Sequence, residues 1–246
     1  MFTDWFTQRY PPIDRSGRSG LPHIGFVVTH GHEGVFLKCM RGILNQLPGE
    51  RFRITVVCHR QVGMQILQPQ ISNPAVEYLA LPSRFDQAAE LVRQAGFDVL
   101  HYWEVGTDVT NYLLPFVRAA PVQCATWGWP TTSGIPTMTH VVSCQGLEPA
   151  DGATHYSEEL VLLERLPTYY YRPPVPDPPP SREQLGLDPR QHLYLCTQNV
   201  RKVHPDMDAL VAAILRRDSA GVMLFISDKQ PAITELLRQR ITQAMP

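Results

Sequence analysis

The 246-residue sequence has little that would direct the protein to a membrane or to nucleic acid. It contains no run of about 18 apolar residues, so no membrane-spanning helix is predicted. Residues 1–6 have neither the basic segment nor the apolar segment of a secretory signal, and we therefore expect a cytoplasmic protein. The formal net charge is −1, which gives no electrostatic reason to expect nucleic acid or an acidic membrane as a partner.

Cysteine pairs and internal repeats are also absent. The five cysteines are scattered and form no Cys-x-x-Cys pair, so neither a zinc ribbon nor a redox motif is predicted. No tetratricopeptide period is found, which excludes a helical-repeat array within this chain. Hydrophobic residues make up 43% of the sequence, enough for the core of one large domain or two small ones.

Short apolar runs alternate with helical periodicity along residues 22–166. The expected strands are 23–29, 52–58, 76–81, 98–103, 122–126 and 141–144, and the expected helices are 35–46, 85–94 and 108–118. Near-continuous apolar strands separated by helices indicate an α/β fold with a parallel sheet covered on both faces. Residues 1–21 are polar and contain prolines and glycines, so we interpret them as a loose lead-in.

A proline-rich segment at 167–181 is predicted to be an extended linker, because this proline density opposes both helix and central strand. Residues 182–246 then give two expected strands, 192–197 and 222–227, and two expected helices, 206–216 and 232–244. Two strands are few for an open α/β domain. We therefore expect an incomplete second lobe in a chain that is truncated.

The expected strand 122–126 leads into a loop of unusual composition. Ligands of α/β folds bind at the carboxyl ends of strands, and two glycines would allow a close approach of the backbone. The alternative interpretation is a structural loop with an aromatic anchor. The candidate binding residues of this loop are Trp127, Gly128, Pro130, Thr131, Thr132, Ser133 and Gly134.

Two histidines follow the first expected strand, at a natural ligand crevice before a helix. His30 and His32 are candidate catalytic residues, although Thr29 or Glu33 would alternatively cap the helix and leave the histidines in solvent. A His-x-His pair also occurs in metal sites, but zinc needs at least three protein ligands and no second cluster supplies them. Glu104 follows the expected strand 98–103 and is a candidate base or a residue that orients a sugar hydroxyl. The alternative is a structural role, as a negative charge at the amino terminus of a helix.

Lys202 lies in a polar turn just past the expected strand 192–197. A lysine there is suited to neutralising a diphosphate leaving group, whereas the alternative is an ordinary surface lysine.

Three segments in the same order, 120–138, 155–161 and 198–205, resemble motifs of the catalytic region of the protein O-GlcNAc transferase family, with the bacterial members most similar. The resemblance implies two Rossmann-like lobes of the GT-B type, the second incomplete here. It implies an inverting transfer of N-acetylglucosamine from UDP-GlcNAc to Ser or Thr hydroxyls of a protein acceptor. The sugar nucleotide is a substrate, and no cofactor or metal is implied.

The resemblance also assigns roles to individual residues. His32 matches the family's active-site histidine, with His30 as the fallback, and Lys202 occupies the position of the lysine that contacts the donor's phosphates. Asn199 stands where the family has Gln, which makes it a further candidate for donor binding. We expect His32 or His30, the loop 127–134 and Lys202 to line one crevice, and this chain alone to transfer sugar poorly or not at all. Two other interpretations stay open: a non-catalytic binding or remnant domain, and a metal-dependent hydrolase using His30 and His32.

Overall fold

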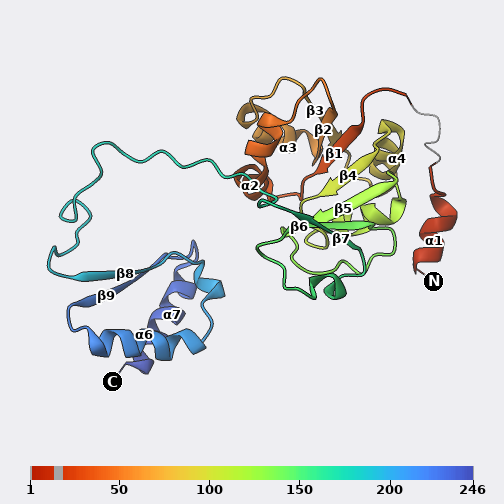
Figure 1. Cartoon of the computed structure of the whole chain (residues 1–246). Helices are drawn as coiled ribbons and strands as arrows, with labels where there is room; N and C mark the ends of the chain where they lie inside the picture. The colour runs from red at the N-terminus through yellow and green to blue at the C-terminus, as the bar shows by residue number, and fades with distance from the viewer. Residues whose placement is uncertain (1, 14–18, 246) are drawn as a thin grey trace. The chain divides into compact units, whose positions relative to one another are not determined.

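The computed structural model describes residues 2–13 and 19–245, and it divides into two compact units, Met1–Arg172 and Pro173–Pro246 (Figure 1). The first unit is built on a seven-stranded sheet in which every pairing is parallel. Its strands, in order across the sheet, are β3 (Val76–Leu81), β2 (Arg53–His59), β1 (His23–Val27), β4 (Val99–Tyr102), β5 (Val122–Thr126), β6 (His140–Cys144) and β7 (Glu159–Leu163).

The strand order reverses beside β1. The chain first builds from β1 to β2 and β3 on one side, and then returns to place β4 to β7 on the other side. Phe26 of β1 lies opposite Val56 of β2 and His101 of β4 in the register. The space between the carboxyl ends of β1 and β4 is therefore a topological switch point, where open α/β sheets bind their ligands.

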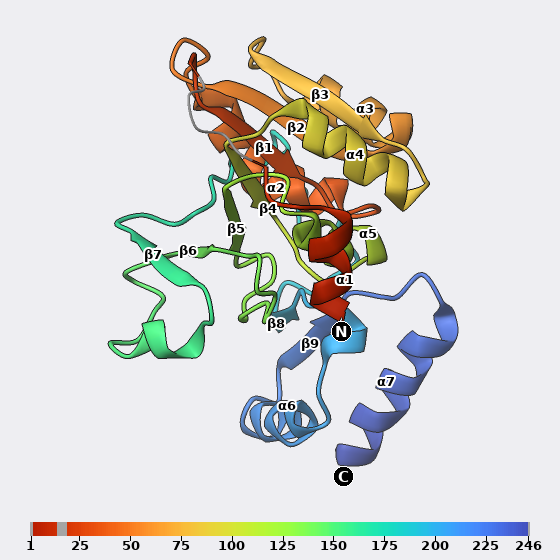
Figure 2. The same ribbon diagram turned by 90° about the vertical axis from the view of Figure 1, so that its right-hand side faces the viewer.

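Helices cover both faces of this sheet, as the sequence predicted (Figures 1 and 2). Phe36 of α2 (Glu33–Gln46) and Leu67 of α3 (Arg60–Leu67) pack with Phe26 on one face. Val92 of α4 (Phe85–Ala95) packs with Val27 on the other face, together with the short helices α5 (Val109–Leu113) and η2 (Leu114–Val117). Phe26 and Val27 are adjacent yet belong to different cores, because side chains alternate along a strand.

The amino-terminal residues correct one expectation. Instead of a loose lead-in, residues 2–9 form a helix, α1 (Phe2–Arg9). Phe6 is 3% exposed, and its ring centroid lies 5.3 Å from that of Phe116 in η2. The polar composition concealed this helix because its docking depends on Phe6 and the nearby Tyr10, which is also buried. Residues 14–18 of the expected lead-in lie outside the described residues.

Several other elements also differ from the sequence prediction. α3 and η1 (Gln68–Gln70), which follow β2, and the edge strand β7 were not predicted. The expected helix 108–118 is divided into α5 and η2, because Pro115 cannot continue the α-helical hydrogen bonds. One more short 3₁₀ helix, η3 (Gly152–His155), lies between β6 and β7.

The second unit contains a parallel pair, β8 (His192–Cys196) and β9 (Gly221–Phe225). The helices α6 (Asp206–Arg217) and α7 (Pro231–Ala244) pack on this pair, and η4 (Val200–Lys202) follows β8. Val200, Val203, Val211, Leu237 and Ile241 form its buried core. In residues 2–13 and 19–245, no helix combines the length and the apolar character needed to cross a bilayer.

Candidate functional site

The loops that follow β1 and β4 meet at the switch point of the first sheet. His32 Nδ1, at the end of the first loop, lies 2.7 Å from Glu104 Oε2 in the second. The His32 side chain is 40% exposed and the Glu104 side chain is 11% exposed, so the imidazole is open to solvent while its carboxylate partner is largely buried. The structure therefore joins two of the residues that the sequence singled out separately.

A buried amide links the same two loops behind this pair. Asn111, in α5, is 2% exposed and its Nδ2 donates to Thr29 Oγ1 at 2.9 Å and to the Glu104 carbonyl at 3.3 Å. Asp108 caps α5 by accepting from the Asn111 backbone N–H at 3.0 Å, and it also accepts from the His30 N–H at 3.4 Å. These contacts fix the position of Glu104 relative to the β1 loop. Sequence reasoning missed Asp108 and Asn111, although an Asp before a short helical segment is a recognisable N-cap.

His30 belongs to a neighbouring group rather than to the His32–Glu104 pair. Its ring centroid lies 4.8 Å from that of His59, at the end of β2, and its Nδ1 lies 3.8 Å from Glu33 Oε1. Burial lowers the pKa of His59, and nearby His30 and Arg60 lower it further, against the opposing charges of Asp108 and Glu33. Across the described part of the chain, no three His, Cys, Asp or Glu side chains are grouped so that they could hold a metal ion.

The loop after β5 packs directly on the loop that carries Glu104. A Cβ on Gly128 would overlap the Trp103 carbonyl oxygen, and a Cβ on Gly106 would lie 3.3 Å from the Trp129 ring. Gly106 also has a φ of +92°, which favours glycine. The half-buried residues Trp127, Gly128 and Trp129 and the exposed Pro130 therefore lie at the same edge of the sheet as Glu104.

Two hydroxyls of this loop are engaged by a carboxylate of the chain itself. Thr132 Oγ1 donates to Glu158 Oε2 at 2.8 Å, and the Ser133 N–H donates to Glu158 Oε1 at 2.9 Å. The Ser133 hydroxyl also donates to Glu158 Oε1. Burial alone would raise the pKa of Glu158, but the hydrogen bonds from Ser133 and Thr132 outweigh it and hold the pKa below its ordinary value. Thr131 and Gly134 are exposed.

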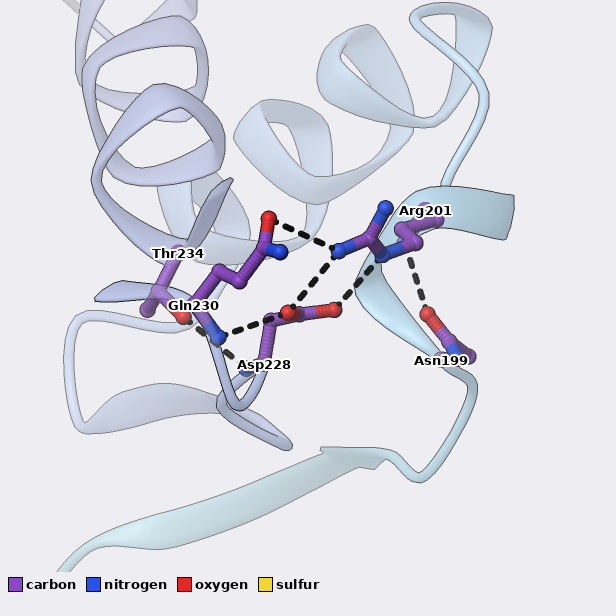
Figure 3. Close-up of polar contacts among 5 residues, drawn as sticks. All are labelled: Asn199, Arg201, Asp228, Gln230 and Thr234. Atoms are coloured by element: carbon purple, nitrogen blue, oxygen red, sulfur yellow. Dashed lines mark hydrogen bonds and ion pairs between the residues drawn. The ribbon is translucent and has the colours of Figure 1, made fainter. Parts of the chain in front are cut away.

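The second unit has a cavity of ≈ 570 Å³ at the carboxyl ends of β8 and β9. Arg201 Nε and Nη2 donate to the two oxygens of Asp228 at 2.9 and 3.2 Å, and Nη2 also donates to Gln230 Oε1 at 3.2 Å (Figure 3). The hydrogen bond from Arg201 lowers the pKa of Asp228. Sequence reasoning did not single out this ion pair, since its partners are 27 residues apart.

The two candidate residues of the second unit lie in and beside η4. Asn199 Oδ1 accepts from the Arg201 backbone N–H at 3.0 Å, so its amide oxygen caps this turn (Figure 3). Lys202 is exposed at the end of η4. That Lys202 shares a crevice with His32 stays a prediction.

Comparison with solved structures shows the fold. No family model matches the sequence, and no curated protein matches it. A mutant of the O-GlcNAc transferase from Thermobaculum terrenum is similar over 98% of this chain, with a TM-score of 0.72 and 21% identity. The matched region is 47% of that protein, so this chain spans about half of its length. A candidate UDP-N-acetylglucosamine 2-epimerase from Listeria monocytogenes is similar over 92% of this chain and over 67% of its own length, with a TM-score of 0.42 and 14% identity. The first unit thus has the fold of a Rossmann-like lobe of the GT-B type.

Proposed function

We propose that this chain is part of an inverting glycosyltransferase that transfers N-acetylglucosamine from UDP-GlcNAc to a Ser or Thr hydroxyl of a protein. The observation that carries the proposal is the His32–Glu104 pair at the switch point of a GT-B lobe. The sequence motifs around residues 120–138 and 198–205 support the same reaction class. The proposal is also supported by the similarity in fold to the O-GlcNAc transferase from Thermobaculum terrenum.

His32 is the proposed general base. A carboxylate only accepts hydrogen bonds, so the 2.7 Å contact with Glu104 requires the proton of the neutral imidazole to be on Nδ1. The lone pair of Nε2 is then free to take the proton of the acceptor hydroxyl. As that oxygen bonds to the anomeric carbon, the bond from this carbon to the diphosphate breaks, and UDP leaves with the electron pair. Glu104 orients the ring and stabilises the imidazolium that forms.

Lys202 and the amino terminus of α2 are the proposed sources of positive charge for the donor. Lys202 presents an exposed ammonium group beside η4, suited to neutralising a departing diphosphate. The first backbone amides of α2 follow His32 directly, and such free amides at a helix start can bind an anion. A Cβ added at Gly34 would have no other atom within 4 Å, so there is open space beside this helix start. The exposed Thr131 and Gly134, farther along the loop after β5, are the proposed contacts for the sugar.

A non-catalytic binding unit is the second candidate. It is favoured by the internal hydrogen bonds of Thr132, Ser133 and Asn199, which occupy polar groups that the sequence assigned to a ligand. A metal-dependent hydrolase is not proposed, because His32 Nδ1 faces Glu104 and His30 faces His59 and Glu33 without a third ligand in the described residues.

A transfer assay combined with calorimetry separates these candidates. Radiolabelled UDP-GlcNAc and a Ser-rich peptide are incubated with the chain, and UDP binding is measured on the same preparation. We expect UDP binding and a turnover well below the enzyme median of about 10 per second. His32→Ala should lower the rate by about 10² to 10⁴-fold, the usual contribution of a general base. His155→Ala is the control, since His155 is exposed and faces Asp151 at 3.9 Å.

Each result has a distinct meaning. UDP binding without any transfer supports the non-catalytic candidate, whereas transfer that survives His32→Ala rejects His32 as the base. Absence of UDP binding contradicts the proposed donor.

A further inference from the structure

The segment that builds β5 to β7 carries charge of one sign only. Residues 119–164 contain no Lys or Arg, although the whole chain has 22 of them. The same segment contains five acidic residues: Glu148, Asp151, Glu158, Glu159 and Glu164. A surface built from this segment therefore favours a cationic ligand over an anionic one.

A cavity of ≈ 250 Å³ lies within this segment, between the loop after β5 and the loop after β6. Trp127, Trp129 and Pro130 line it from the first loop, while Glu148 and Tyr156 line it from the second. Aromatic rings combined with a carboxylate are the chemistry that binds a guanidinium or ammonium group, through cation–π contact and ion pairing.

The carboxylate of this cavity is held in place by two hydroxyl donors. Glu148 Oε1 accepts from Ser143 Oγ at 2.6 Å and from Tyr156 OH at 3.0 Å. Burial raises the pKa of Tyr156, and its hydrogen bond to Glu148 and the charges of Glu148 and Glu158 raise it further. Tyr156 therefore stays a neutral donor, and the cavity contains negative charge without a compensating cation from the segment.

Arginine is enriched at protein–protein interfaces, so a partner polypeptide is the source of the cation that we consider. We propose that this cavity binds an arginine side chain of a partner polypeptide, with the guanidinium between the aromatic rings and Glu148. The proposal goes beyond the transfer reaction and does not depend on it.

The test uses the whole chain, labelled with ¹⁵N, and the peptide acetyl-Gly-Arg-Gly-amide. The control peptide carries citrulline, which has the shape of arginine but no charge. The four tryptophans give four indole N–H signals, which Trp→Phe variants assign. We expect the arginine peptide to shift the Trp127 and Trp129 signals, with Trp5, in α1, as the unperturbed reference. The citrulline peptide should bind about tenfold more weakly, in line with loss of an ion pair and a cation–π contact.

A variant pair tests the carboxylate. Glu148→Gln should lower the affinity for the arginine peptide by about tenfold. Glu164→Gln, which removes an equal charge from an exposed position, should change this affinity by less than about twofold. Equal binding of the arginine and citrulline peptides overturns the proposal, and that comparison needs no variant. Equal binding of ethylguanidinium and the arginine peptide rejects the assignment to a polypeptide. Displacement of the arginine peptide by N-acetylglucosamine would instead make the cavity a sugar site.

Discussion

His32 and Glu104 are 72 residues apart in the chain, and their Nδ1 and Oε2 atoms lie 2.7 Å apart. The contact exists because β1 and β4 are neighbours in the sheet while the chain visits β2 and β3 between them. The pair combines an accessible imidazole with a largely buried carboxylate. This asymmetry is what a general base needs: one nitrogen reaches the substrate, and the other is held in a defined tautomer.

Replacing Glu104 tests whether the carboxylate sets the tautomer. In Glu104→Gln we expect transfer activity to fall by about 10 to 100-fold, because an amide both donates and accepts and no longer requires the proton to be on Nδ1. The ¹⁵N shifts of His32 report the tautomer without any activity. Asp151→Asn, opposite His155, is the control. An unchanged Nδ1-protonated tautomer in Glu104→Gln would contradict the prediction.

The pKa of His59 should lie below 6.5 in an NMR titration, chiefly because of burial and secondly because of His30. His30→Asn removes one source of positive charge and should raise the pKa of His59. Because the folded-state pKa is the lower one, the unfolded chain takes up the proton first, and this group reduces stability as pH falls below its ordinary value. A His59 pKa that does not rise in His30→Asn would show that the two rings are not coupled.

Glu158 should contribute stability that depends on pH. Its folded-state pKa is depressed, so the contribution is present above the ordinary glutamate value and is lost as pH falls through the folded pKa. Glu158→Gln should lower the free energy of unfolding by about 1–3 kcal/mol at pH 7. The difference from the unchanged chain should shrink toward pH 3. Glu159→Gln, with a side chain that is 77% exposed, is the matched control in urea unfolding.

Gly128→Ala should displace the loop after β5. Its added methyl group would overlap the Trp103 carbonyl, a backbone atom that cannot rotate away, so we expect a loss of about 1–3 kcal/mol. Gly146→Ala has nothing within 4 Å of its new methyl group and should unfold like the parent. Equal unfolding midpoints for the two variants would mean that the loops do not pack as described.

Phe6→Ala tests whether α1 is an integral part of the first unit. Phe6 is 3% exposed against Phe116 and Phe85, so its truncation should cost about 3–5 kcal/mol. Trp5→Ala alters a side chain that is 57% exposed and should change stability by less than about 0.5 kcal/mol. If Phe6→Ala unfolds at the same denaturant concentration as Trp5→Ala, α1 does not dock in solution.

The sequence alone predicted the α/β class, the parallel sheet and most of its strands. This was possible because burial on both faces leaves a local signature, a short apolar run rich in Val, Ile and Leu, as in 52–58. The sequence also indicated His32, Glu104 and the loop 127–134 as candidate site residues, because polar residues that directly follow a predicted buried strand can be recognised without a structure. The edge strand β7 was missed although residues 160–163 form a continuous apolar run, and in the structure these residues are half-buried or exposed.

Only the tertiary structure decided how these residues are paired. Strand order and register bring Glu104 to His32 and His59 to His30, and neither order nor register can be read from local periodicity. The same holds for Glu158, which accepts hydrogen bonds from the hydroxyls of Thr132 and Ser133, 26 and 25 residues away in the sequence. It also holds for Phe6, whose aromatic partners are on η2 and α4. Local sequence reports which residues must be buried, whereas the packing of distant segments determines which groups those residues meet.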